Sequence, residues 1–197
     1  MTTRHVVALS AGHYPSKPGA SNKYIVEHHE AAIWVDELAR ELSKTFAAIV
    51  VPTGSLTSKV KFINMPSLAV DLALEIHFNA CGGCGASGCE TLYMPNSDLG
   101  LAAAAVIQKH LAPAMGNKDR GAKEGWYKTD KPGKVDYPGD LDGDEVVDYF
   151  LRATKPVALI IEPEFIDHYE LIWARRNVAC KALATAVKEI FNSWPLK

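Results

Sequence analysis

The sequence predicts an α/β protein built on an open, parallel β-sheet. Three runs rich in apolar residues, at 5–10, 72–78 and 157–161, have the length and composition of buried strands. Between the first two lies segment 26–46, where apolar residues recur at helical spacing. Buried strands with helices packed over them are typical of this fold class.

Each of these three runs leads into a residue that can do chemistry. His13 follows the small-residue turn after the first run, His77 lies near the end of the second, and Glu162 comes directly after the third. In an open parallel sheet, ligands bind outside the carboxyl ends of the strands. We therefore expect these three side chains to meet at one edge of the sheet.

The bulk composition is that of a single globular domain spanning residues 1–197. Hydrophobic residues make up 48% and charged residues 22% of the chain. A net charge of −2 argues against nucleic-acid binding, and no apolar run is long enough for membrane insertion. The first residues show no signal-peptide profile, so we expect synthesis in the cytoplasm. The four cysteines are too few for a disulfide scaffold.

The remaining elements follow from periodicity and turn residues. Segment 55–70 is ambiguous and is interpreted as one helix, and segment 125–149 as a long loop or insertion, because Gly, Pro, Asp and Lys dominate it. The other predicted elements are strands at 48–51 and 90–94, a short strand starting at 120–123, and helices at 99–114 and 168–194.

Glu27 is the carboxylate best placed to join the two histidines. It falls on the apolar face of helix 26–46, where an unpaired carboxylate would be costly. Glu30 is the alternative, but it falls off that face, beside Glu37 and Glu41. The helical-face argument therefore favours Glu27.

Two histidines and one glutamate form a recurring ligand set for catalytic zinc, which keeps one position open for water. His13, Glu27 and His77 are the candidate ligands, and Glu162 is the candidate proton acceptor and donor. Apolar neighbours would raise the pKa of Glu162. Ordinary roles also remain open: loop or core histidines, a glutamate that favours a helix start, and a residue that ends a strand.

Five short motifs occur along the chain and carry a family resemblance. They are Gly12-His13 with Pro18-Gly19-Ala20 following, Val26-Glu27-His28-His29, Ile76-His77-Phe78-Asn79-Ala80, Arg120-Gly121-Ala122-Lys123, and Ile161-Glu162-Pro163-Glu164-Phe165. Together they resemble the zinc-dependent N-acetylmuramoyl-L-alanine amidases of the amidase-3 type, especially the catalytic domains of bacteriophage endolysins.

The resemblance implies a single twisted, mostly parallel β-sheet flanked by helices. It implies one catalytic Zn2+ on His13, Glu27 and His77, with Glu162 as the catalytic glutamate. The implied reaction cleaves the amide between the lactyl group of N-acetylmuramic acid and L-alanine in peptidoglycan, which lyses the cell wall. We expect a monomer that reaches the wall after release, for which a phage holin would open the membrane.

Some residues depart from the family pattern. Ser10-Ala11 stands where many members have Asp-Pro, and Glu75 stands where Ser is usual, two residues before His77. Glu75 either orients His77 or is a surface glutamate that faces a helix. His28 and His29 are neighbours in a helix, so they do not share a face and are predicted to lie at the surface.

Several alternatives stay open. Cys81, Cys84 and Cys89 are interpreted as free thiols or an adventitious disulfide rather than a redox or zinc motif. Segment 140–145 matches a calcium loop poorly, and segment 125–149 either lines the peptide cleft or is solvated. A stem-peptide peptidase or carboxypeptidase on the same zinc ligands, and a non-catalytic wall-binding module, are the alternative functions.

Overall fold

A six-stranded sheet runs through the centre of the molecule, with strand order β2-β1-β3-β8-β4-β5. The computed structural model describes residues 5–128 and 145–194. The strands, in the order of the sheet, are β2 Ala47–Val50, β1 Val6–Ala11, β3 Leu72–Ile76, β8 Val157–Glu162, β4 Cys89–Tyr93 and β5 Asp119–Glu124.

The sheet is mixed, with a parallel part that contains the predicted strands. Strands β2, β1, β3 and β8 run parallel to one another, β4 is antiparallel to β8, and β5 is parallel to β4. The expected α/β fold with one mostly parallel sheet is therefore confirmed, with a reversed pair of strands at one edge. A separate antiparallel pair joins β6 Trp126–Lys128 to β7 Glu145–Val147.

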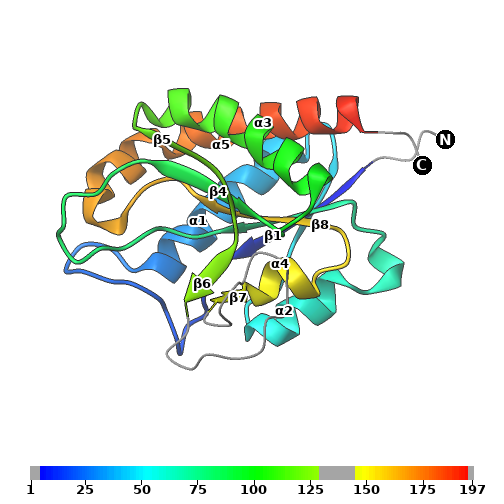
Figure 1. The fold of residues 1–197 in the computed structure, drawn as a ribbon, viewed down its shortest axis with the longest axis horizontal. Coiled ribbons are helices and arrows are strands. Elements are labelled where there is room, and N and C mark those ends of the chain that lie inside the picture. Colours follow the sequence, from blue (N-terminus) through cyan, green and yellow to red (C-terminus); the bar gives the residue numbers. More distant parts are fainter. Residues whose placement is uncertain (1–4, 129–144, 195–197) are drawn as a thin grey trace.

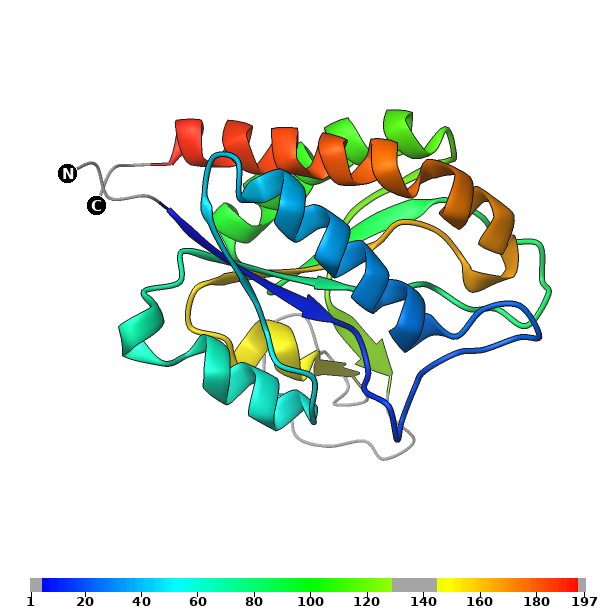
Figure 2. The ribbon, with the colours of Figure 1, turned by 180° about the vertical axis from the view of Figure 1, so that it is seen from behind.

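Helices cover both faces of the sheet. Three long helices, α1, α3 and α5, lie on one face, and the shorter α2 and α4 lie on the other (Figures 1 and 2). Their bounds are α1 Glu27–Leu42, α2 Leu56–Ile63, α3 Asp98–Met115, α4 Tyr149–Ala153 and α5 Tyr169–Ser193. None of the helices described here is long and apolar enough to cross a membrane.

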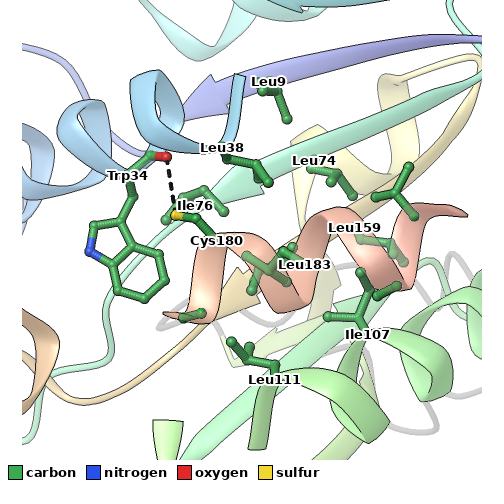
Figure 3. Close-up of a cluster of buried hydrophobic side chains, with 14 of the residues drawn as sticks. Leu9, Trp34, Leu38, Leu74, Ile76, Ile107, Leu111, Leu159, Cys180 and Leu183 are labelled. Carbon is green, nitrogen blue, oxygen red and sulfur yellow. Dashed lines mark hydrogen bonds between the residues drawn. The ribbon is translucent and has the colours of Figure 1, made fainter. Parts of the chain in front are cut away.

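The alternation of side chains along β3 divides the core between the two faces. Leu72 and Leu74 face the long helices, while Ala73 faces the side covered by α2 and α4. The larger cluster packs the sheet against α1, α3 and α5, and Figure 3 shows Leu74, Leu159 and Leu183 within it. Each such fully buried leucine stabilises the fold by about 1.5–3 kcal/mol relative to an exposed one.

Two predicted segments differ from the observed ones. Segment 55–70 is not one helix, because α2 ends at Ile63 and a 3₁₀ turn follows at Pro66–Leu68. Proline disfavours helix in the residue before it, which explains the break at Met65. In segment 125–149, the expected loop contains β6, β7 and the start of α4. The weak calcium motif lies at 140–145, and its residues 140–144 fall outside the described residues.

Candidate active site

Three parallel strands end side by side, and this brings the candidate residues together. Ala11 of β1 pairs with Ile76 of β3, which in turn pairs with Ile161 of β8. The residues that follow these pairs, His13, His77 and Glu162, line one cavity of about 500 Å³ together with Glu27. The expected meeting at the carboxyl edge of the sheet is therefore what the structure shows.

The turn after β1 places His13 against His77. His13 has a φ of 58°, in the left-handed region that residues with a side chain rarely adopt. The amide of Gly12 donates to the carbonyl of Ile76 at 2.7 Å, which ties this turn to the end of β3. A Cβ at Gly12 would lie 2.6 Å from the His77 ring, so only glycine allows this approach.

Glu27, the first residue of α1, points into the same cluster. Its Oε2 accepts from the amide of Ala20 at 2.9 Å, and its Oε1 accepts from the amide of Phe78 at 3.1 Å. Gly19, with a φ of 78°, lies so close that a Cβ there would be 2.4 Å from Glu27 Oε2. These contacts hold a carboxylate that is only 3% exposed.

The two histidines approach opposite oxygens of this carboxylate. His13 Nε2 lies 3.1 Å from Glu27 Oε2, and His77 Nδ1 lies 3.0 Å from Glu27 Oε1. One possible ligand atom from each of the three residues lies within 4.8 Å of the other two. Donors bound at zinc distances in a tetrahedron are about 3.3 Å apart, so the two histidine–carboxylate distances and the chemistry of this donor set fit a zinc ion.

The charged groups of this cluster shift one another's pKa values. Burial opposes ionisation of Glu27, but hydrogen bonds with His13 and His77 hold its pKa far below the usual range. Burial likewise opposes the charge on His77, but Glu27 and Glu75 hold its pKa well above the usual range. The carboxylates therefore favour a positive charge at this point of the cavity.

Glu162, the last residue of β8, is a further acidic side chain that lines this cavity. It is 8% exposed, and its Oε2 has no hydrogen-bond partner among the residues that the structure describes. Burial, together with the carboxylates of Glu27, Glu90 and Glu75, raises the pKa of Glu162 to about 8, although His77 opposes the shift. A carboxyl group with such a pKa can both accept and donate a proton near neutral pH.

Glu75 is not a surface residue. It is 2% exposed, and its Oε2 lies 3.3 Å from His77 Nε2. Its Oε1 accepts from Ser10 at 2.8 Å and from Lys59 at 3.2 Å. Of the two interpretations left open for Glu75, the surface one is wrong, and the contact with His77 is present.

The sequence patterns did not identify Lys59 as a residue of the site. It is 3% exposed, and lysine is almost never that buried unless it is paired. The available signal was its place on α2, where Leu56, Lys59 and Ile63 occur at the spacing of one helix face. An ammonium group on an otherwise apolar helix face indicates a buried partner.

Two predictions about helix α1 need correction. His28 is 6% exposed, and its Nδ1 lies 2.8 Å from the carbonyl of Gly12, so it is not a surface residue, whereas His29 is exposed. Glu30 is also buried, but its partners are Trp34, Trp173 and Arg176 rather than the histidine cluster. Burial at α1 extends beyond the predicted apolar face because α5 packs against Glu30 and the turn after β1 lies against His28.

The Arg120–Lys123 motif and Asn79 meet at a residue that the sequence did not single out. Glu90 of β4 accepts from Asn79 at 3.0 Å, from Arg120 at 2.8 Å and from Lys123 at 2.5 Å. Glu90 is paired in register with Glu162 across β4 and β8. Asn79 and the Arg120–Lys123 motif therefore lie beside the edge of the sheet that carries Glu162.

In the part of the chain that the structure describes, the cysteines do not form a metal cluster. Cys81 and Cys84 are joined by a disulfide, which is one of the two predicted states. Cys89 is a separate, buried thiol in β4, and its Sγ lies 3.2 Å from Gln108 Oε1.

Comparison with known proteins identifies the same architecture. The model of the Amidase_3 family, described as N-acetylmuramoyl-L-alanine amidase, matches residues 7–190. No curated protein sequence matched the chain. Among solved structures, an N-acetylmuramoyl-L-alanine amidase from Clostridium difficile 630 superposes with a TM-score of 0.79 at 21% identity, covering 98% of this chain and 99% of that one.

Two further structures are similar. The catalytic domain of CwlV, an N-acetylmuramoyl-L-alanine amidase from Paenibacillus polymyxa var. colistinus, has a TM-score of 0.76 at 20% identity, covering 96% of this chain and 99% of that one. The catalytic domain of the CD27L endolysin targeting Clostridia difficile has a TM-score of 0.68 at 23% identity, covering 98% and 99%. At these identities the structures support the fold, and the family model extends over nearly the whole chain: the protein belongs to the N-acetylmuramoyl-L-alanine amidase family Amidase_3.

Proposed function

We propose that the protein is a zinc-dependent N-acetylmuramoyl-L-alanine amidase that cleaves the bond between N-acetylmuramic acid and L-alanine in peptidoglycan and so lyses the cell wall. The observation that carries this proposal is the convergence of His13, Glu27 and His77 in the cavity that Glu162 also lines. Membership of the amidase family makes peptidoglycan the expected substrate.

In this proposal His13, Glu27 and His77 hold the zinc ion. A bound zinc ion lowers the pKa of water and polarises the scissile carbonyl. The backbone amides of Ala20 and Phe78 keep the Glu27 carboxylate in place. With zinc bound, Glu75 would accept a hydrogen bond from Nε2 of His77, so that Nδ1, which faces Glu27, would be the nitrogen offered to the metal.

Glu162 is the proposed proton-transfer residue. Its carboxylate would take a proton from the attacking water and then give it to the nitrogen of the departing L-alanine. The pKa of about 8 that burial produces favours the first transfer, because it makes the carboxylate a stronger base. Donation in the second step is still possible, because the nitrogen of an amine is more basic than this carboxylate. Oε2 of Glu162 is without a hydrogen-bond partner within residues 5–128 and 145–194, and this leaves the oxygen available for the reaction.

The setting in which the enzyme acts is also part of the proposal. We infer that the protein is made in the host cytoplasm, works as a monomer and reaches the wall after release through a holin-opened membrane. One of the similar structures is the catalytic domain of an endolysin, which supports a role of this kind.

The test combines metal analysis with wall hydrolysis. The purified protein should contain about one zinc per chain, reduce the turbidity of purified walls, lose this activity on chelation and regain it with added zinc. The products should carry a new free amino terminus on L-alanine. New termini elsewhere in the stem peptide would indicate a peptidase, and equal wall clearing by Glu162→Gln would contradict the proposed proton transfer.

A further inference from the structure

A buried network of Ser10, Lys59 and Glu75 lies behind the candidate zinc ligands. These residues come from β1, α2 and β3, and all three are at most 3% exposed. None of them is among the three residues that bring ligand atoms together. Polar and charged groups at such depth are costly unless they are fully paired, so their contacts need an explanation.

The ammonium group of Lys59 contacts the backbone on both sides of the Gly12 turn. It donates to the carbonyl of His13 at 2.7 Å and to the carbonyl of Ala11. His13 has a φ of 58°, an unfavourable conformation for a residue with a side chain. The two hydrogen bonds from Lys59 hold the backbone of this turn in place and thereby restrict the position of the His13 ring.

The same ammonium group is linked to His77 through the carboxylate of Glu75. Lys59 Nζ donates to Glu75 Oε1 at 3.2 Å, and Ser10 donates to the same oxygen at 2.8 Å. The other oxygen, Glu75 Oε2, lies 3.3 Å from His77 Nε2. A carboxylate on the outer nitrogen of a metal-ligating histidine fixes the tautomer and the orientation of the ring.

We propose that Lys59 is a positioning residue that aligns two zinc ligands at once, His13 through its backbone carbonyl and His77 through Glu75. This inference rests on the proposed zinc site and adds a residue to it. A single cation from α2 then couples the end of β1 to the end of β3, so that both imidazoles are placed before the metal arrives. Glu75 in place of a smaller residue is explained by the same arrangement, because its carboxylate is the link between Lys59 and His77.

Zinc affinity of a charge-neutral double variant tests this proposal. Lys59→Met with Glu75→Gln removes the ion pair without changing the net charge of the network, so that long-range attraction for a dication is preserved. Replacing a buried ion pair by groups of similar size is often tolerated by the fold. Loss of the supporting contacts should weaken zinc binding by about 10- to 100-fold, the usual effect of removing the partners of metal ligands.

The chain offers a matched control. Lys109 and Glu189 form an exposed ion pair at 2.8 Å, so Lys109→Met with Glu189→Gln makes the same chemical change away from the site. Zinc dissociation constants of the parent and of both double variants would be measured by competition with a chromophoric chelator, and thermal unfolding of each metal-free protein would be recorded.

The outcomes separate this inference from the proposed function. Weaker zinc binding by the Lys59 and Glu75 variant, with the control at the parent value, supports the inference. Equal affinity in all three proteins overturns it and leaves the zinc site intact, whereas a parent that binds no zinc overturns both. If the double variant does not fold, Ser10→Ala is the second charge-neutral change. It should weaken zinc binding several-fold, because Glu75 loses a hydrogen-bond donor. Unchanged zinc affinity in this variant would overturn the inference.

Discussion

Replacing Glu162 by glutamine should stabilise the metal-free protein at alkaline pH. Burial raises the pKa of Glu162 from 4.5 to about 8, so the folded state favours the protonated carboxyl group. The stabilisation from this group is therefore fully present below pH 4.5 and is lost as the pH rises to about 8. Glutamine stays neutral over this whole pH range, so the variant does not lose this stabilisation.

The size of this effect follows from the shift. At about 1.4 kcal/mol per pKa unit, a shift from 4.5 to about 8 corresponds to about 5 kcal/mol. The free energy of unfolding of Glu162→Gln, relative to that of the parent, should rise by about this amount across the interval. Glu27, Glu75 and His77 are present in both proteins, so the part of their titration that does not depend on Glu162 cancels in the difference.

The assay is urea unfolding of both proteins in a chelator at closely spaced pH values from 4.5 to 8.5. Glu170→Gln is the control for the same chemical change, because this glutamate is exposed and does not line the cavity. A difference for Glu162→Gln that stays flat from pH 4.5 to 8.5, or that only matches the control, would refute the reasoning, because it would mean that Glu162 ionises as readily in the folded protein as in the unfolded chain.

Three further predictions concern catalysis, metal binding and stability. Glu162→Gln should retain zinc while its turnover number on purified walls falls by about 10²- to 10⁴-fold, the range expected for loss of a general acid–base group; turnover near the parent value would rule out this role. Gly12→Ala should weaken zinc binding, because its Cβ would lie 2.6 Å from the His77 ring; competition titration with a chelator measures this, and parental affinity would mean that the ring adjusts freely. Glu30→Gln weakens the contact with Arg176 Nη1 at 2.7 Å, so chemical unfolding should show a loss of about 1–3 kcal/mol with zinc affinity unchanged; a loss of zinc instead would place Glu30 in the metal site.

Local pattern was enough to predict the strands and helices outside segments 55–70 and 125–149, and most of the candidate site. Apolar runs are recognisable as buried strands whatever surrounds them, so the ends that carry His13, His77 and Glu162 could be located in advance. Helical periodicity placed Glu27 on an inward face, and in the structure it lies between the two histidines. These are properties of neighbouring residues, which a linear sequence contains directly.

What the sequence by itself determined, then, was where most of the strands and helices lie and which side chains stand where strands end. Only the tertiary structure decided which segments lie beside one another: β8 inserts between β3 and β4, β4 runs against it, and α2 brings Lys59 under the turn at His13. The burial of His28 and the pairing of Glu75 depend on such contacts between distant segments. Contacts of this kind arise when whole faces pack together, and no short stretch of sequence specifies them.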